Sequence, residues 1–266
     1  MNKENLNPSI EGLLRTWLPG KRWFPVKSPD FALEQVGGFR LQGSGDAVLE
    51  VLVLAVTHRT ADGGPRTDVI QVPLSFHSQP LVDAPSALLG EYTDPELGLR
   101  LVYDAVYDSE FVTAWLQLMR SEGNVGSARG HLTRGRVPLP ENPVSVRVLS
   151  GEQSNTSVII DDGDSAAIVK IFRVLSPGRN PEVELGAALT AAGTSEVPAT
   201  LGWITGSWNE PASKDGAVAT GELTVAHEFL LGGLDAWRLA VDAAAAGNDF
   251  TAEARGLGNA TATVHA

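Results

Sequence analysis

Three features between residues 151 and 184 could together contact the phosphates of a nucleotide. The first is a polar turn at 151–155, the second is Lys170 within the apolar run 168–172, and the third is Glu184 in a helix-like segment. Phosphoryl transfer needs backbone amides that approach the phosphates, a lysine that balances their charge and a carboxylate that orients the lysine. The order of loop, lysine and glutamate therefore favours a nucleotide-phosphate site.

Each feature also has an ordinary structural explanation. A polar turn is a common hairpin connection, a lysine near a strand end is usually a solvated edge residue, and one glutamate on a helix is usually an exposed charge. Lys170 is the most informative of the three, because an ammonium beside apolar neighbours is costly without a partner. The ordered combination, more than any single residue, supports the site.

The elements that would position these residues follow from apolar patterning and turn residues. Strands are predicted at 48–54, 68–72, 98–103, 144–149, 156–160, 166–172, 199–208 and 223–230, with a hairpin loop at 61–65. Helices are predicted to begin after the capping residues Asn7, Asp108 and Asn180, and to cover 234–246 and the chain from Phe250 onward. The sequence therefore predicts an α+β fold built on antiparallel sheets.

Two features bear on domain organisation. Residues 123–143 are rich in Gly, Pro, Arg and Ser, which is typical of a connecting segment, so a domain boundary is expected near residue 140. The final helical pattern continues to His265 without a Gly, Asn or Pro stop, and helix ends generally need capping. We therefore expect the sequence to stop inside a structural element.

Composition excludes several classes of partner and site. The formal net charge of -12 and a pI near 4.8 argue against nucleic acid and anionic membrane surfaces. The chain has no cysteine, and its five histidines are too scattered for a local metal-ligand motif. A structural metal is therefore not expected. The N-terminus lacks the pattern of a secretion signal, so a soluble cytoplasmic protein is expected.

Several motifs resemble actinobacterial maltokinase, which belongs to the aminoglycoside-phosphotransferase-like kinases. The segments that carry the resemblance are 151–157, 169–172 and 180–185 for the kinase part, and 17–19, 22–24 and 104–118 for an N-terminal cap domain. The resemblance implies a cap domain with an antiparallel sheet and helices over 1–140. It further implies a kinase-like N-lobe over 141–232 and the first helices of an incomplete C-lobe over 233–266.

The resemblance also implies an activity and its site. Maltokinases transfer the γ-phosphate of ATP, with Mg²⁺, to maltose and form maltose 1-phosphate. The residues implied to bind nucleotide are Gly151, Glu152, Gln153, Ser154, Asn155, Thr156 and Ser157 in the phosphate loop, Lys170 with Glu184 as its orienting partner, and Glu228 and Leu230 in a hinge at 227–230.

The sequence departs from this family in its catalytic motifs. Neither a His-Gly-Asp-like catalytic loop nor an Asp-Phe-Glu-like metal segment occurs in the 266 residues, so the chain is expected to be inactive alone. Two alternatives remain. One is a non-catalytic assembly or regulatory module beside a glucan- or trehalose-metabolising enzyme, and the other is a kinase of another acceptor, such as glucosamine or an aminoglycoside.

Three tryptophans allow two interpretations. Trp17, Trp23 and Trp115 could form a platform for a carbohydrate ring, but packing within the cap domain is the stronger expectation.

Overall fold

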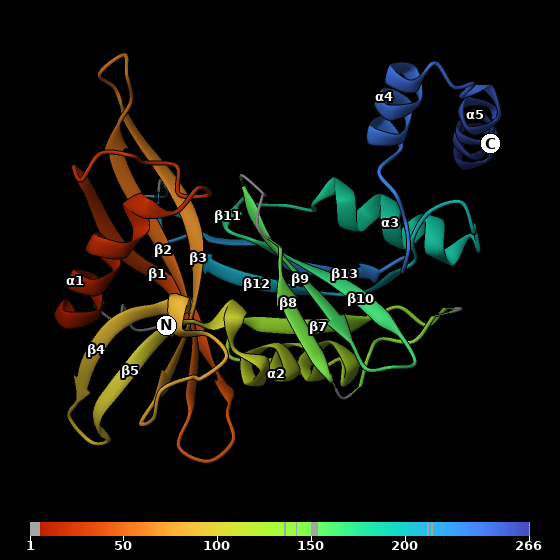
Figure 1. The fold of residues 1–266 in the computed structure, drawn as a ribbon. Helices are drawn as coiled ribbons and strands as arrows, with labels where there is room; N and C mark the ends of the chain where they lie inside the picture. Colours follow the sequence, from red (N-terminus) through yellow and green to blue (C-terminus); the bar gives the residue numbers. More distant parts are fainter. Residues whose placement is uncertain are drawn as a thin grey trace.

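The computed structural model describes residues 6–265 except 136, 142, 150–153, 212 and 214, and it has an α+β architecture with two antiparallel sheets (Figure 1). The first sheet contains β1 (Phe31–Gln42), β2 (Val48–Arg59), β3 (Pro65–His77), β4 (Leu88–Asp94), β5 (Gly98–Asp104) and the short β11 (Val174–Leu175). Its strand order is β1-β2-β3-β5-β4, and β11 pairs with β3. The predicted antiparallel sheet in the N-terminal part is confirmed.

The second sheet is formed mainly by later residues. It contains β6 (Asn124–Val125), β7 (Ala128–Leu132), β8 (Ser145–Val148), β9 (Asn155–Asp161), β10 (Ala166–Phe172), β12 (Thr200–Asn209) and β13 (Val218–Glu228). Their order is β6-β7-β12-β13-β10-β9-β8, so β10 lies between β9 and β13 in the middle of the sheet.

Five helices accompany the sheets in the part of the chain that the structure describes, and the last two come after the final strand of the second sheet. They are α1 (Pro8–Trp17), α2 (Ser109–Arg120), α3 (Pro181–Ala191), α4 (Ala236–Ala246) and α5 (Thr251–His265), with 3-10 turns at Leu18–Gly20, Pro85–Ala87 and Ala105–Tyr107. The side chains of Asn7, Asp108 and Asn180 accept hydrogen bonds from the backbone amides two residues later, each at 2.9 Å. These contacts satisfy amides that a first helical turn leaves unpaired, and they confirm the three predicted helix starts.

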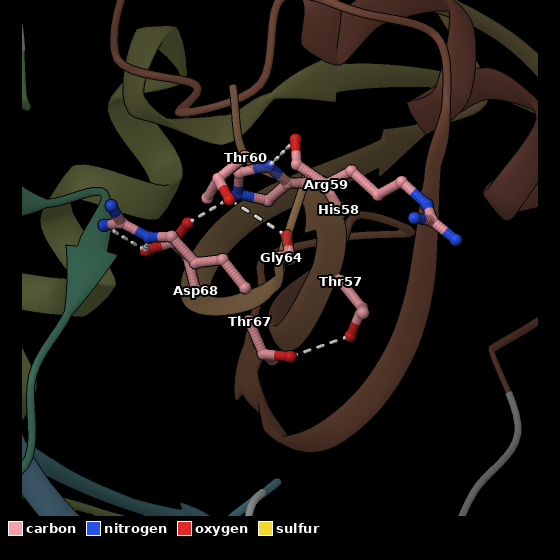
Figure 2. Close-up of polar contacts among 8 residues, drawn as sticks. Thr57, His58, Arg59, Thr60, Gly64, Thr67 and Asp68 are labelled. Atoms are coloured by element: carbon pink, nitrogen blue, oxygen red, sulfur yellow. Dashed lines mark hydrogen bonds and ion pairs between the residues drawn. The ribbon is translucent and has the colours of Figure 1, made fainter. Parts of the chain in front are cut away.

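The hairpin between β2 and β3 is held by polar side chains around the predicted loop (Figure 2). Thr57 and Thr67 form a cross-strand hydroxyl hydrogen bond of 2.9 Å, and the His58 Nε2 atom lies 3.0 Å from Asp68 Oδ2. The Thr60 hydroxyl donates to the Gly64 carbonyl at 2.9 Å. These contacts fix the register of two long strands that continue into the core.

The first sheet is the middle layer of the N-terminal part, because both faces of β2 are buried. Leu52 and Leu54 pack with Leu14 of α1 on one face, whereas Val51 and Val53 join the core that also contains α2 and the second sheet. Successive strand residues point to opposite faces, so burial on both sides accounts for the continuous apolar run of β2.

The prediction of a connecting segment at residues 123–143 is wrong for its first ten residues or so, which contain two strands. Residues Asn124–Val125 and Ala128–Leu132 form β6 and β7, and β7 pairs with β12 inside the second sheet. Strand β7 was not predicted, because it is short, contains Gly and Arg, and has only a weak apolar pattern. Gly130 is required where it lies, because a Cβ atom there would meet the Leu118 carbonyl oxygen of α2 at 1.9 Å.

A buried ion pair joins the two sheets. The Arg173 Nη2 atom lies 2.8 and 2.9 Å from the two carboxylate oxygens of Asp104, and the two residues are 0% and 2% exposed. Arg173 Nε also donates to the Thr156 hydroxyl at 2.9 Å, and its guanidinium lies 4.7 Å from the centre of the Trp23 ring. One side chain thus contacts the end of β5, the start of β9 and the segment after α1.

The backbone beside Arg173 completes the edge of β3. β5 pairs with β3 only at Leu74–His77, while Val174 and Leu175 pair with Ile70 and Val69. The Gln71 amide nitrogen of the backbone donates to the Arg173 carbonyl at 3.0 Å. The Gln71 side chain, which is 0% exposed, donates to the Phe172 carbonyl at 2.6 Å and to the Leu223 carbonyl. These bonds make the first and second sheets one packed unit.

We predict that Asp104→Ala lowers the free energy of unfolding by about 3–5 kcal/mol, because it leaves the buried Arg173 charge without its carboxylate. Urea unfolding followed by tryptophan fluorescence measures this loss. Glu11→Ala, which removes one partner of an exposed pair with Arg15, should cost about 0.5 kcal/mol or less. The double variant Asp104→Leu with Arg173→Met should recover most of the loss. An Asp104→Ala protein as stable as Glu11→Ala would contradict the role given to the ion pair.

Candidate functional site

Lys170 lies on β10, an interior strand of the second sheet that is paired on both sides. Its register partners are Ser157 on β9 and Val225 on β13. The Thr224 hydroxyl also donates to the Lys170 carbonyl at 2.7 Å. The Lys170 side chain is 27% exposed, so its ammonium reaches the surface while its stem is covered.

The carboxylate that holds Lys170 comes from the first turn of α3. Lys170 Nζ donates to Glu182 Oε2 at 2.9 Å, and His227 Nε2 lies 3.4 Å from Glu182 Oε1. The other ring nitrogen of His227 lies 3.2 Å from the Thr200 hydroxyl. Asn180 caps α3 through the Glu182 amide, which fixes the backbone from which the carboxylate projects. The Glu182 carboxylate therefore contacts Lys170 through one oxygen and His227 through the other.

The prediction that Glu184 orients Lys170 is wrong in its choice of residue. Glu184 is exposed, and Glu182 makes the contact instead. Residues two apart on a helix point to different sides, so only one of these two glutamates can face β10. The sequence showed two glutamates in one helical turn, and only the rotation of α3 relative to the sheet decides between them.

The neighbours of Glu182 strongly favour its charged form. The hydrogen bond with His227 is the largest influence; burial opposes it, and the hydrogen bond and charge of Lys170 add to it. Together they lower the pKa of Glu182 from 4.5 to about 2. The glutamate is therefore ionised at neutral pH and can hold the Lys170 Nζ atom in position through the 2.9 Å hydrogen bond.

The predicted phosphate loop is divided by the structure. Gly151, Glu152 and Gln153 lie outside the described residues, whereas Ser154 is exposed just before β9 and Asn155 is the first residue of that strand. Thr156 and Ser157 are strand residues with buried side chains, at 8% and 1% exposure. The Thr156 hydroxyl accepts a hydrogen bond from Arg173, so this residue serves the joint between the sheets.

The predicted hinge residues lie at the end of β13 and just after it: Glu228 is the last residue of the strand, and Leu230 comes two residues later. The Glu228 amide donates to the Ala199 carbonyl at 2.8 Å, and a Glu228 carboxylate oxygen accepts from the Ala199 amide at 3.0 Å. The Phe229 amide donates to the Ala166 carbonyl at 2.9 Å. Leu230 is 53% exposed at the beginning of the connection to α4. Glu228 is thus bonded to the residue that precedes β12, and Leu230 lies at the surface.

Sequence reasoning placed His227 in the hinge but missed its contact with Glu182. The signal lies in the register: His227 pairs with Ile168 and Val225 pairs with Lys170. Ile168 and Lys170 are two residues apart on one strand and therefore share a face. A correct pairing of these two strands would have placed His227 beside Lys170.

In the part of the chain that the structure describes, no group of three or more His, Asp or Glu side chains is arranged to hold a metal ion. Among the same residues, none of the helices is both long enough and apolar enough to cross a membrane.

A comparison with protein families decides the nature of the first sheet. Residues 17–108 match the family model of the maltokinase N-terminal cap domain. These residues form a maltokinase N-terminal cap domain. The match includes β1 to β5 and relates the chain to maltokinase, which confirms the resemblance at its N-terminal part. Lys170, Glu182 and His227 lie outside the matched residues.

The tryptophans in and beside the cap domain pack within the protein. Trp23 is 8% exposed and lies edge-on to Trp17, with ring centres 5.8 Å apart. Trp115 is 1% exposed and stacks on Phe39 at 5.9 Å. Packing therefore accounts for Trp23 and Trp115, and neither offers a ring face to a sugar.

We predict that Glu182→Gln flattens the loss of stability in acid, whereas Glu184→Gln does not. A lowered folded-state pKa adds stability above the usual value of 4.5, and this contribution is lost as the pH falls towards about 2. Because the pair is partly exposed, we expect an effect of about 1 kcal/mol or less. Urea unfolding at pH values from neutral to strongly acidic measures it. Equal acid dependence in the two variants would reject the Glu182 assignment.

Proposed function

We propose that the chain is the cap domain and nucleotide-binding half of a maltokinase-like sugar kinase. The observation that carries this proposal is the Lys170–Glu182 pair on β10 and α3, preceded along the chain by a polar turn and followed by a hinge segment. A kinase uses such a pair to hold a lysine at the nucleotide phosphates. The cap-domain match supports the sugar-kinase relation independently.

We propose three parts for the chain: the cap domain over 1–140, a kinase-like N-lobe over 141–232 and the start of a helical C-lobe over 233–266. The boundary near residue 140 stays a proposal, because β6 and β7 precede it and yet belong to the second sheet. Helices α4 and α5 extend beyond α3 (Figure 1), and within the described residues neither has a buried side chain. Leu231, Leu234 and Trp237 are 72%, 73% and 77% exposed, which suits a region that packs against further protein.

The described residues fit the phosphates of ATP better than they fit its metal ion. Lys170 would contact the phosphates, Glu182 would take the orienting role first expected of Glu184, and the turn that includes Ser154 and Asn155 would lie over the phosphates. Glu228 and Leu230 would border the adenine. For Mg²⁺, the described residues offer no cluster of three carboxylate or imidazole ligands, so the fit fails on this chain's own side chains.

The parent reaction would be ATP plus maltose to ADP plus maltose 1-phosphate. The sequence carries no His-Gly-Asp-like loop to accept the hydroxyl proton, so we propose that this chain alone does not complete the transfer. The same observation favours a second candidate, a non-catalytic module that works beside a glucan- or trehalose-metabolising enzyme. Other acceptors of the parent enzyme, such as glucosamine or an aminoglycoside, remain part of the proposal.

We predict that Lys170→Met weakens binding of a fluorescent ATP analogue by about tenfold or more, which corresponds to 1.4 kcal/mol. The loss follows from removing the one charge that the site directs at the phosphates. Lys27→Met is the matched control, because Lys27 is an exposed lysine of the cap domain. Fluorescence titration with and without Mg²⁺ measures both variants, and equal affinities would reject the phosphate role of Lys170.

We predict no measurable ATP turnover by the 266-residue chain with maltose or glucosamine as acceptor. A coupled assay for ADP measures this, and the wild-type chain should still bind the ATP analogue in the same preparation. Turnover that depends on an acceptor would overturn the proposal that the chain lacks a catalytic half. Binding without turnover is the expected result.

A further inference from the structure

The cap domain contains a cavity that none of the roles above uses. It has a volume of about 460 Å³, within the usual range of about 300–1,000 Å³ for small-molecule sites. Its wall is formed by the face of the first sheet that α1 covers, together with residues just before α1. The polar and aromatic lining residues used below are Arg40, Glu50, Phe76, Tyr92, Asp94 and Arg100.

Arg100 is the least satisfied charged group in this wall. It is 7% exposed, and its Nε atom has no hydrogen-bond partner among the described residues. Its Nη1 atom has only two long contacts, 3.4 Å to the Leu99 carbonyl and 3.4 Å to Asp46, whose side chain is 55% exposed. Buried guanidinium groups are normally well paired, so the two long contacts of Arg100 Nη1 are ones that a ligand in the cavity can replace with shorter hydrogen bonds.

Acceptors and a second donor lie in the same wall. Arg40 Nε donates to Glu50 Oε1 at 3.3 Å across β1 and β2, and these side chains are 70% and 19% exposed. One Asp94 oxygen accepts from the amides of Glu96 and Leu97 at 2.8 and 2.9 Å, which fixes this carboxylate at the end of β4. The two arginines and two carboxylates leave the wall without net charge.

An aromatic pair supplies an apolar surface beside these charges. Tyr92 is the register partner of Arg100, and its ring centre lies 6.1 Å from that of Phe76 in an edge-to-face arrangement. The Tyr92 hydroxyl also accepts a hydrogen bond from Asn7 at 3.2 Å, which ties the residue before α1 to the wall. The cavity therefore combines fixed donors, fixed acceptors and ring surface.

This combination selects a class of ligand. The carboxylates of Glu50 and Asp94 offset the two arginines, so the wall has no excess positive charge to favour a phosphate or polyphosphate, and four charged side chains are a poor environment for a purely apolar molecule. A hydroxyl donates and accepts at once, so a ligand with several hydroxyls can satisfy the arginines and the carboxylates together. Its C–H faces can pack on Tyr92 and Phe76. We propose that this cavity of the cap domain binds a neutral sugar.

The proposed sugar site is separate from the proposed nucleotide site. The cavity lies on the first sheet, whereas Lys170 and Glu182 lie on the second sheet and α3. Sugar binding at the cavity does not require ATP binding or phosphoryl transfer. Failure of the nucleotide proposal would leave this one intact, and the reverse also holds.

Isothermal titration calorimetry on the full chain tests the site, with glucose, maltose and inorganic phosphate as separate probes. We expect both sugars to give a saturable binding heat and phosphate to give none. Tyr92→Ala and Arg40→Gln should each weaken sugar binding by about tenfold, which corresponds to 1.4 kcal/mol. Arg40 is mostly exposed, so its replacement should leave the fold intact even if Tyr92→Ala lowers the thermal unfolding temperature.

Matched controls are available in the same chain. Arg66→Gln changes an exposed arginine on β3 that pairs with Asp68. Tyr107→Ala changes a tyrosine that is 42% exposed. Neither residue is among those that line the cavity. Both controls should bind sugar as the wild type does. The proposal is overturned if phosphate binds and the sugars do not, if no sugar binds, or if the controls lose binding as much as Arg40→Gln.

Discussion

The ion pair between Arg173 and Asp104 is the contact on which the arrangement of the molecule depends. Removing one partner of a buried ion pair leaves an uncompensated charge, and here both carboxylate oxygens, Thr156 and the Trp23 ring contact one guanidinium, whose Nη1 atom alone has no hydrogen-bond partner among the described residues. The same contacts join the cap domain to β9 and to the end of β10. Since Lys170 lies three residues before Arg173, the position of the proposed nucleotide site is linked to that of the cap domain.

The two cationic side chains near the end of β10, Lys170 and Arg173, differ in burial and in role. Arg173 is fully buried and stabilises the joint between the sheets, whereas Lys170 is partly exposed and held by Glu182 at the surface. A buried charge with several partners is fixed in position, and a partly exposed one can exchange its carboxylate for a ligand phosphate. This difference in solvation, more than any difference in sequence context, separates the structural cation from the one proposed to bind nucleotide.

Much of the fold could be predicted because its signals are local. The strands β2, β3, β9, β10 and β13 and the helix starts at Asn7, Asp108 and Asn180 follow from apolar patterning and capping side chains. The site depended on relations that are not local. Choosing Glu182 over Glu184 requires the rotation of α3, and finding His227 requires the register of β10 and β13. β7 was missed because pairing with β12, and not its own residues, makes it a strand.

The pairing of β11 with β3 has a consequence for the cap domain as an evolutionary unit. The family match ends at residue 108, yet the half of the β3 edge that β5 does not cover is completed by residues 173–175, which directly follow β10 of the second sheet. A gene segment cut at the end of the match would encode a sheet with an open edge and an aspartate buried without its cation. The matched sequence module therefore does not contain all the residues that complete its sheet, and a transfer of the module to another protein would keep these contacts only if the short strand β11 went with it.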